Sequence, residues 1–520
     1  MDTFLHKFES LIKGCITGFD RIVFKGCLRS LMFTAGAHQF FRARGVLNKD
    51  YKEWVTKQSA ALVETANHTA QTICGQDITY IPSSNTSKED LAHARQQERG
   101  IKHGLIGVWS CVESCLTYRA CYDATAGFPQ LHITDSRCKH LYFYYDHADY
   151  GCMSIRLQTQ FPFNIQIAMN GREWLRRSLE QEGCQYLIAG NKFLHIDDYA
   201  LAQHLLDRQL DTRWVEMLTG MLPEVFPTMT QTLGDRLSYY WTLWQSEWAT
   251  DYVFDSPAVV NALIDRLISH ALITGNGERV LRYLGRPVCA DGQPHPLANP
   301  EVQSRVEKWS DGARIRHWVD QNSVKLYNEQ NVLRVEMTMN NPRAYKVYRL
   351  AEGQLDGPKR RLPLRKGVAD IILRTQVADD VNHRFMAQMA TLKDTTPVRD
   401  LLQEIIQPFT HDGRRVRALD ITGKDRALLQ AIAAPEYAMS GITNKALQQS
   451  LGSLPWANEK TGKHLSARIS RNLRLLRDHG LIRKMPNQRK YQLTEKGRKL
   501  TSALTVMLAA STEQLLEKAA

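Results

Sequence analysis

The sequence lacks any long hydrophobic run and lacks the short motifs of several common enzyme classes. No stretch of the 520 residues approaches the ~18 to 20 apolar residues that a bilayer-spanning helix needs, and the opening MDTFLHKFESLIKG has no apolar signal-peptide core. There is no Walker loop, GxGxxG, HExxH or GxSxG. These absences argue against the usual ATPase, dinucleotide-binding and hydrolase classes. They favour a cytoplasmic protein without a membrane partner.

The sequence also lacks CxxC pairs, although it has ten cysteines, all within its first 289 residues. Cys111 and Cys115 lie four apart in the apolar run 104–118, which we expect to be a buried helix. A zinc site there would need two more ligands from the cysteines and histidines at 121–140. We favour small buried hydrophobic side chains in a reducing compartment.

Positive charge is concentrated at one end of the chain. The formal net charge is +13, and residues 421–520 contain 17 Lys or Arg against 7 Asp or Glu, which accounts for +10 of it. This asymmetry indicates a polyanionic partner for the C-terminal part.

Within that part, residues 462–494 predict a helix followed by a hairpin. At about 100° per residue, one narrow stripe of the helix carries Leu465, Ile469, Leu473 and Leu476, which must face a core. A turn at 486–488 separates two short strands. Basic residues occupy the rest of the helix and the hairpin arms: Lys463, Arg468, Arg471, Arg474, Arg477, Arg483, Lys484, Arg489 and Lys490.

Together with helices expected at 424–434 and 443–451 and a closing helix at 495–516, this pattern resembles the winged helix-turn-helix domain of MarR-like bacterial regulators. Thr443 is the expected N-cap of the second helix. The resemblance covers 418–520. It implies a helix in the DNA major groove and a hairpin against the flanking phosphates. An RNA target and a homodimer both stay open.

A second informative block spans residues 314–349. Its pattern predicts strands at 315–319, 323–327 and 332–339, so that Lys325 and Tyr327 would face Arg334 and Glu336 across neighbouring strands. The alternative to a functional site is an exposed ladder of charged side chains on a sheet face, without a catalytic role.

This block has a weak resemblance to rolling-circle replication initiators. The resemblance implies that Tyr327 attacks a DNA phosphate, that Glu336 is a ligand of a divalent metal, and that Lys325 and Arg334 contact phosphates. The His-hydrophobic-His motif common in that group is absent, so the other metal ligands are unknown. Asp20, in a strand expected at 16–28, is interpreted as a surface or hairpin-end carboxylate rather than a ligand.

Three other segments bear on nucleic-acid binding. Strands at 152–160 and 163–169 would share a face rich in Arg, Gln and Asn. The aromatic residues at 239–248 have helical spacing within a long helical region, which favours a core stripe over base stacking. A basic loop at 356–367 could contact phosphates through Lys359, Arg360 and Arg361.

We therefore expect a multidomain α+β protein. The predicted segments are an α+β domain at 1–196, a helical region at 197–300 ending in a Pro/Gly-rich linker, a β-rich block at 301–417, and a winged helix at 418–520. The first four-fifths resemble a group of bacterial proteins common in mobile and metagenomic DNA, to which no activity is assigned.

The predicted function is DNA binding, as a regulatory or mobile-element factor. The alternative is a metal-dependent DNA-nicking replication initiator or transposase-like enzyme that uses Tyr327. No cofactor is evident, and a divalent metal is expected only under the alternative.

Overall fold

The computed structural model describes residues 2–82, 86–234, 237–275, 277–285, 302–309, 312–354, 356–392, 402–433, 441–459, 461–485 and 488–494, and a few positions between 496 and 507. The chain divides into two compact units. Unit 1 comprises residues 1–264, 306–316 and 321–383, and unit 2 comprises 265–305, 317–320 and 384–520. Each unit is described by itself.

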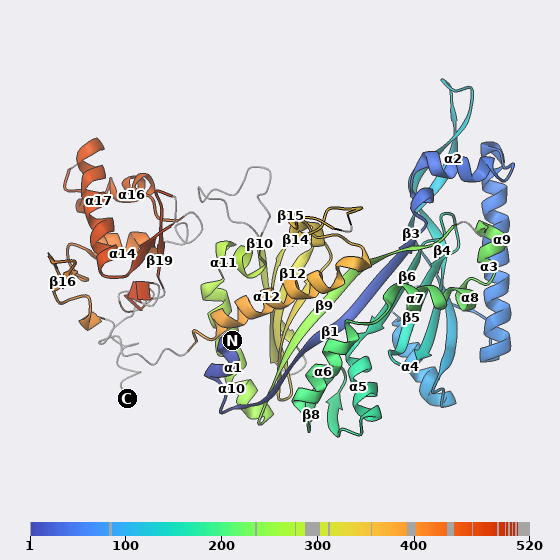
Figure 1. Ribbon diagram of the computed structural model, residues 1–520, viewed down its shortest axis with the longest axis horizontal. Coiled ribbons are helices and arrows are strands. Elements are labelled where there is room, and N and C mark those ends of the chain that lie inside the picture. Colours follow the sequence, from blue (N-terminus) through green and yellow to red (C-terminus); the bar gives the residue numbers. More distant parts are fainter. Residues whose placement is uncertain are drawn as a thin grey trace. The chain divides into compact units, whose positions relative to one another are not determined.

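An eleven-stranded sheet is the frame on which unit 1 is built (Figure 1). Its strand order is β10-β11-β12-β13-β9-β1-β6-β5-β4-β3-β2. Their bounds are β1 (Ile12–Cys27), β2 (Thr79–Tyr80), β3 (Gly104–Asp123), β4 (Phe128–His147), β5 (Gly151–Gln158), β6 (Ile165–Asn170), β9 (Tyr240–Phe254), β10 (Val302–Trp309), β11 (Gly312–Val319), β12 (Asn322–Glu329) and β13 (Val332–Met339).

The centre of this sheet brings together strands that are far apart in sequence. β1 pairs antiparallel with β6 on one side and with β9 on the other, and β9 pairs antiparallel with β13. β1 and β9 run side by side as long curved strands (Figure 1). Strands from the predicted segments 1–196, 197–300 and 301–417 thus belong to one sheet.

Helices and short hairpins connect these strands along the chain. They are α1 (Thr3–Lys7), α2 (Thr34–Arg42), α3 (Tyr51–Cys74), α4 (Lys88–Arg99), α5 (Gly171–Gln181), β7 (Tyr186–Ala189), β8 (Lys192–Ile196), α6 (Tyr199–Gln209), α7 (Trp214–Gly220), α8 (Leu222–Val225), α9 (Met229–Leu233), α10 (Pro257–Thr274), α11 (Gly277–Tyr283), β14 (Lys346–Arg349), β15 (Arg360–Pro363) and α12 (Ile371–Met389). Of these, α11 and the second half of α10 belong to unit 2. Single 3-10 turns lie at Arg29–Met32, Asn48–Asp50, Pro342–Ala344 and Val368–Asp370.

Two helix predictions are wrong. Residues 104–118 belong to the strand β3, which pairs along its length with β4, and the aromatic residues of 240–248 belong to β9, the strand between β1 and β13. Both stretches contain aromatic and β-branched residues, which favour strands when flanking strands cover them. In β9 a bulge near Trp244 shifts the alternation of buried residues, and the resulting spacing imitates a helix.

The C-terminal part of unit 2 contains the elements expected around a buried helical stripe. These are β16 (Phe409–His411), β17 (Arg414–Val416), α14 (Arg426–Ala433), α16 (Asn444–Leu451), a 3-10 turn at Pro455–Ala457, α17 (Gly462–Asp478), β18 (Ile482–Lys484) and β19 (Tyr491–Leu493). Leu465, Ile469, Leu473 and Leu476 of α17 are buried in one cluster with residues of α14 and α16. Thr443 caps α16 by accepting from Ala446 N at 3.0 Å, as predicted.

Some expected features fall outside the described residues. They include the predicted linker at 285–300 except its first residue, the predicted turn at 486–488 except its last residue, and most of the closing helix at 495–516. Within the described ranges, no single helix is long and apolar enough to cross a bilayer. The bent pair α10 and α11 would pass that test only together, by length and composition.

Candidate functional sites

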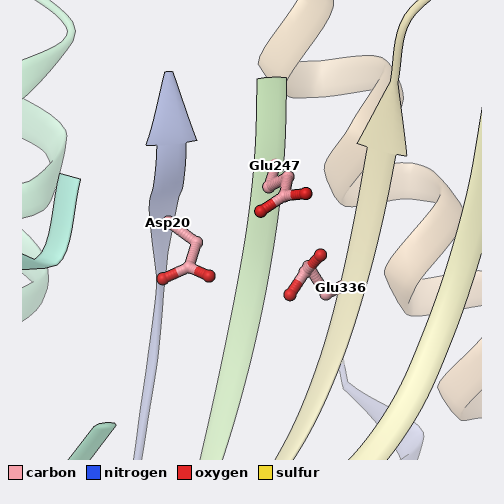
Figure 2. Close-up of side chains that lie close together, drawn as sticks. All are labelled: Asp20, Glu247 and Glu336. Atoms are coloured by element: carbon pink, nitrogen blue, oxygen red, sulfur yellow. The ribbon is translucent and has the colours of Figure 1, made fainter. Parts of the chain in front are cut away.

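Three carboxylates from three neighbouring strands converge in the middle of the large sheet. Asp20 lies on β1, Glu247 on β9 and Glu336 on β13, and one oxygen of each lies within 4.8 Å of the others. Figure 2 shows the three side chains directed toward a shared space. Asp20 reaches it from a bulge between Phe19 and Ile22, where β1 departs from regular pairing with β9. We call Asp20, Glu247 and Glu336 the carboxylate centre.

The interpretation of Asp20 as a surface or hairpin-end carboxylate is wrong. Its residue is only 8% exposed, in the middle of a central strand. It accepts a hydrogen bond from Asn191 Nδ2 and lies 3.0 Å from Nη1 of Arg334. The alternation of β1 in sequence could not reveal this burial, because it depends on β9, β13 and the β7–β8 turn.

Tyr327 and Glu336 lie together as the hairpin pattern predicted. In the β12–β13 register Tyr327 faces Arg334 and Lys325 faces Glu336. Tyr327 Oη donates to Glu336 Oε2 at 3.0 Å, and Lys325 Nζ lies 2.5 Å from Glu336 Oε1 and 3.7 Å from Glu247. The alternative prediction of an exposed ladder of charged side chains is wrong, since Glu336 is 2% exposed.

Arg334 is a buried structural cation and is not placed to contact a phosphate on the surface. It is 1% exposed, and it donates to Asp251 through Nε at 2.5 Å and through Nη2 at 2.8 Å. Asp251 also lies 3.1 Å from Arg172 of α5. The predicted phosphate contact by Arg334 is therefore wrong, and the guanidinium instead ties β13 to β9 and β1.

Negative charge exceeds positive charge in this buried network. Four carboxylates, including Asp251, share three cations, Arg172, Lys325 and Arg334. Burial, with the nearby charge of Glu336, raises the pKa of Glu247 to about 7. Burial also raises the pKa of Asp20, although Arg334 opposes it. Arg21, in the wall of the adjoining cavity, compensates Glu247 in part, and a proton or a bound cation would neutralise the remaining charge.

The other two ionisable groups of the centre are held in defined states. Burial acts to raise the pKa of Glu336, but Lys325 and Arg334 outweigh it and the pKa lies below its ordinary value. Burial and the charge of Glu336 raise the pKa of Tyr327 well above that of a free phenol. Tyr327 is therefore a protonated donor to Glu336 at neutral pH.

A cavity of about 270 Å³ adjoins the carboxylate centre. Asp20 and Glu247 form part of its wall, together with Arg21, Ser154 and Asn170. Carboxylate oxygens are the ligands that Mg²⁺ and Mn²⁺ prefer, so Asp20, Glu247 and Glu336 suit a hard divalent cation with open positions toward this cavity.

A second group of functional side chains lies in unit 2. Arg471, Arg474 and Arg477 are exposed on α17. They line a cavity of about 640 Å³ with three arginines of the β16–β17 hairpin and its end: Arg414, Arg415 and Arg417. We call this cavity the arginine cleft. Its six arginines face only two lining aspartates, Asp412 and Asp478.

The remaining predicted basic residues differ in their surroundings. Arg468 is half-buried with its guanidinium 4.7 Å from the ring of Trp456, so part of its role is packing. Lys490 is half-buried. Exposed positions are taken by Lys463, Arg483, Lys484 and Arg489 and, in the β14–β15 hairpin, by Lys359, Arg360 and Arg361.

Sequence reasoning missed Glu247, Asp251 and Asn191. Glu247 and Asp251 lie four apart on β9, and both point to the face that carries Arg334 and Glu336. Acidic residues within an aromatic stretch were the available signal for a buried site. Because that stretch was predicted to be a helix, Glu247 and Asp251 were not recognised as facing Glu336.

The comparisons with known proteins do not place this chain in a family. No family model matches it, and no curated protein matches it. Among solved structures, the di-domain ARO/CYC BexL from the BE-7585A biosynthetic pathway aligns at 10% identity with a TM-score of 0.17. That alignment covers 60% of this chain and 95% of BexL, and at this TM-score it carries no argument about fold or function.

Proposed function

We propose that the protein binds DNA through the arginine-rich surface of α17. The observation that carries the proposal is the arginine cleft, where six arginines face the two lining aspartates and Arg417 is also paired with Asp425, which leaves an excess of three positive charges. Among the described residues, no carboxylate lies within ion-pairing distance of Arg414, Arg415 or Arg471. Such unpaired guanidinium groups suit the phosphates of a nucleic-acid backbone.

The buried stripe of α17 supports this proposal. Because Leu465, Ile469, Leu473 and Leu476 face the core, Arg471 and Arg474 point away from it. A helix held by its apolar side and exposing arginines on the other fits a major groove. The basic strand β18 follows directly, and Arg489 and Lys490 come just before β19. A role in regulation or in a mobile element is part of the same proposal.

Binding of the full chain to labelled duplex DNA at several salt concentrations tests the proposal. We expect affinity to fall steeply with salt, because each neutralised phosphate releases counterions. Selection of bound fragments from random sequence then shows whether a base sequence is preferred. If binding to duplex DNA is undetectable or does not depend on salt, the proposal is wrong.

A second function is supported by the carboxylate centre: metal-dependent cleavage of a phosphodiester. The specific observation is that the predicted pair Tyr327 and Glu336 is hydrogen-bonded and shares its site with two more acids from distant strands. Asp20, Glu247 and Glu336 would hold the divalent cation, which would supply positive charge to a phosphate and to the phenol oxygen.

In this second proposal Tyr327 is the nucleophile. Its Oη gives up a proton and forms an O–P bond with the DNA phosphate, while the P–O bond to one bridging oxygen breaks and that oxygen takes a proton from water to become a hydroxyl end. Glu336 accepts the hydrogen bond from Oη and orients the phenol, but its lowered pKa makes it a poor base, so the phenol proton passes to water. Lys325 holds Glu336 in position. Incubation with supercoiled DNA and Mg²⁺ or Mn²⁺, followed by denaturing electrophoresis, would reveal nicked product bound to protein.

A further inference from the structure

Unit 1 carries a cluster of cations around two exposed aromatic rings, separate from the carboxylate centre. Tyr240 and Trp244 on β9 are 39% and 42% exposed, which is unusual for large aromatic side chains on a central strand. Lys25 Nζ lies 4.9 Å and Lys366 Nζ 4.4 Å from the centre of the Trp244 ring. The guanidinium of Arg29 lies 4.7 Å from the ring of Tyr240. We call these five residues the aromatic ledge.

The backbone fixes this arrangement from three directions. Lys25 belongs to β1, and its neighbour on the paired strand β9 is Thr242. Lys366 is held against β9 because its carbonyl accepts from Leu243 N at 2.8 Å. Gly367 permits the approach, since a Cβ there would lie 2.6 Å from Tyr240 Oη.

The positive charge of the ledge is not balanced by neighbouring acids. In the part of the chain that the structure describes, Lys25, Arg29 and Lys366 have no carboxylate within ion-pairing distance. Burial lowers the pKa of Lys25, and burial with the charges of Arg374, Arg343 and Lys25 lowers that of Lys366. Like charges gathered in this way repel one another, and a bound anion would relieve the repulsion.

The ledge lies on the same face of the sheet as the cavity beside the carboxylate centre. In the unbroken register of β1 with β6, Arg21 faces Asn170 and Lys25 faces Gln166, so Arg21 and Lys25 point the same way. Arg21 and Asn170 line the cavity next to Asp20 and Glu247. Arg21 and Lys25 lie four residues apart along β1, which corresponds to about 13 Å.

From this geometry we infer that the ledge binds single-stranded nucleic acid and leads it toward the carboxylate centre. Phosphates pair with Lys25, Lys366 and Arg29, and unpaired bases pack on Trp244 and Tyr240. A duplex keeps its base faces inside the stack, so the exposed rings of Tyr240 and Trp244 favour a single strand. The inference rests on the proposed action on nucleic acid and adds a second surface and the form of ligand that it takes.

Binding of the full chain to a labelled oligodeoxynucleotide, the same sequence as RNA, and the matching duplex tests the inference. We expect Lys25→Gln with Lys366→Gln to lower the salt slope for the single strand by about 1.4, since each phosphate contact contributes about 0.7. Trp244→Ala should weaken single-strand binding at least about five-fold. Duplex affinity should not change with either variant. Comparison of the DNA and RNA oligonucleotides shows whether deoxyribose or ribose is preferred.

Matched variants separate this effect from loss of charge or folding. Lys52→Gln with Lys57→Gln removes two exposed lysines from α3, and Tyr122→Ala removes a ring that is 71% exposed at the end of β3. Neither should alter single-strand binding. Photo-crosslinking to a bromodeoxyuridine oligonucleotide should label the peptide that contains Tyr240 and Trp244.

Two outcomes would overturn the inference. If the ledge variants bind the single strand like their controls, and crosslinks fall only within residues 463–490, the ledge is not a binding surface although the DNA-binding proposal stands. If the full chain binds no nucleic acid in any form, the proposed function fails and the inference fails with it.

Discussion

Glu247 carries the least compensated charge of the carboxylate centre. Lys325, at 3.7 Å, is nearer to Glu336, and burial raises the pKa of Glu247 to about 7. Between the ordinary pKa near 4.5 and about 7, the folded protein keeps a proton that the unfolded chain releases. Stability should therefore fall as pH rises through this window.

Glu247→Gln should remove this pH dependence. At pH 8 we expect the variant to be more stable than the parent by about 3 kcal/mol, because no buried carboxylate has to ionise, and the difference should vanish below about pH 4.5. Thermal unfolding of parent and variant at several pH values measures this difference in stability. The same substitution should abolish stabilisation by Mn²⁺, whose affinity in the parent should rise as pH approaches about 7 and then level off. Equal Mn²⁺ responses of parent and variant would contradict a cation site at Glu247.

Tyr327→Phe distinguishes the two proposed functions at a single oxygen. The change removes the hydroxyl that donates to Glu336 and leaves the ring in place. We expect duplex binding to be unchanged and any metal-dependent nicking to fall by at least about 1,000-fold, as for loss of a nucleophile. Tyr252→Phe is the matched control, since Tyr252 is also buried, at 1% exposed against 6% for Tyr327, and donates to Asp2 at 2.6 Å. Nicking that survives Tyr327→Phe would assign the attack to another group.

At the scale of elements, α17 is a helix with two separate tasks. Its four apolar residues hold it in the core of the C-terminal part, and its arginines form one wall of the arginine cleft. The opposite wall is the β16–β17 hairpin. Packing of the Phe409 ring on His479, 5.0 Å apart, holds the hairpin beside the end of α17.

Arg471→Ala with Arg474→Ala should weaken duplex binding of all sequences. Each lost phosphate contact should lower the salt slope by about 0.9, so the double variant should lose about 1.8. Anisotropy titrations at several salt concentrations give the slope. Arg208→Ala with Arg213→Ala, which removes two exposed arginines of unit 1, should leave it unchanged. A similar loss in both double variants would show that overall charge matters and the position on α17 does not.

At the scale of the whole molecule, one guanidinium links three strands of the large sheet. Arg334 on β13 pairs with Asp251 on β9 and with Asp20 on β1, and Asp251 in turn meets Arg172 of α5. These partners are distant in sequence, so the network forms only when the sheet is complete. The carboxylate centre is a consequence of that assembly.

Arg334→Met should destabilise unit 1 strongly. It leaves Asp251 and Asp20 buried with fewer cations, and breaking a buried pair from one side costs about 3 to 5 kcal/mol. Arg176→Met is the control, because Arg176 pairs with Glu173 and Glu180 in a partly solvent-exposed position, and its loss should cost about 1 kcal/mol. Denaturant unfolding measures both. If Arg334→Met lowers the free energy of unfolding no more than Arg176→Met does, the buried network does not hold the sheet together.

Local patterns determined the parts of the protein that neighbouring residues alone can specify. The hairpin β12–β13 was predicted with its facing pairs, because alternation and a short turn fix which residues meet. The apolar stripe of α17 and the cap at Thr443 were predicted for the same reason. These features place Tyr327 beside Glu336 and arginines on the outside of a helix.

Only the tertiary structure decided the carboxylate centre and the aromatic ledge. Asp20, Glu247 and Glu336 are brought together by the order β13-β9-β1, and Lys25 and Lys366 meet at Trp244 through pairing across the sheet. The sequence of β9 shows a helical spacing of aromatics, and strand pairing on both sides overrides it. Whether a charged side chain is buried depends on which distant strand supplies its partner, and no local pattern contains that information.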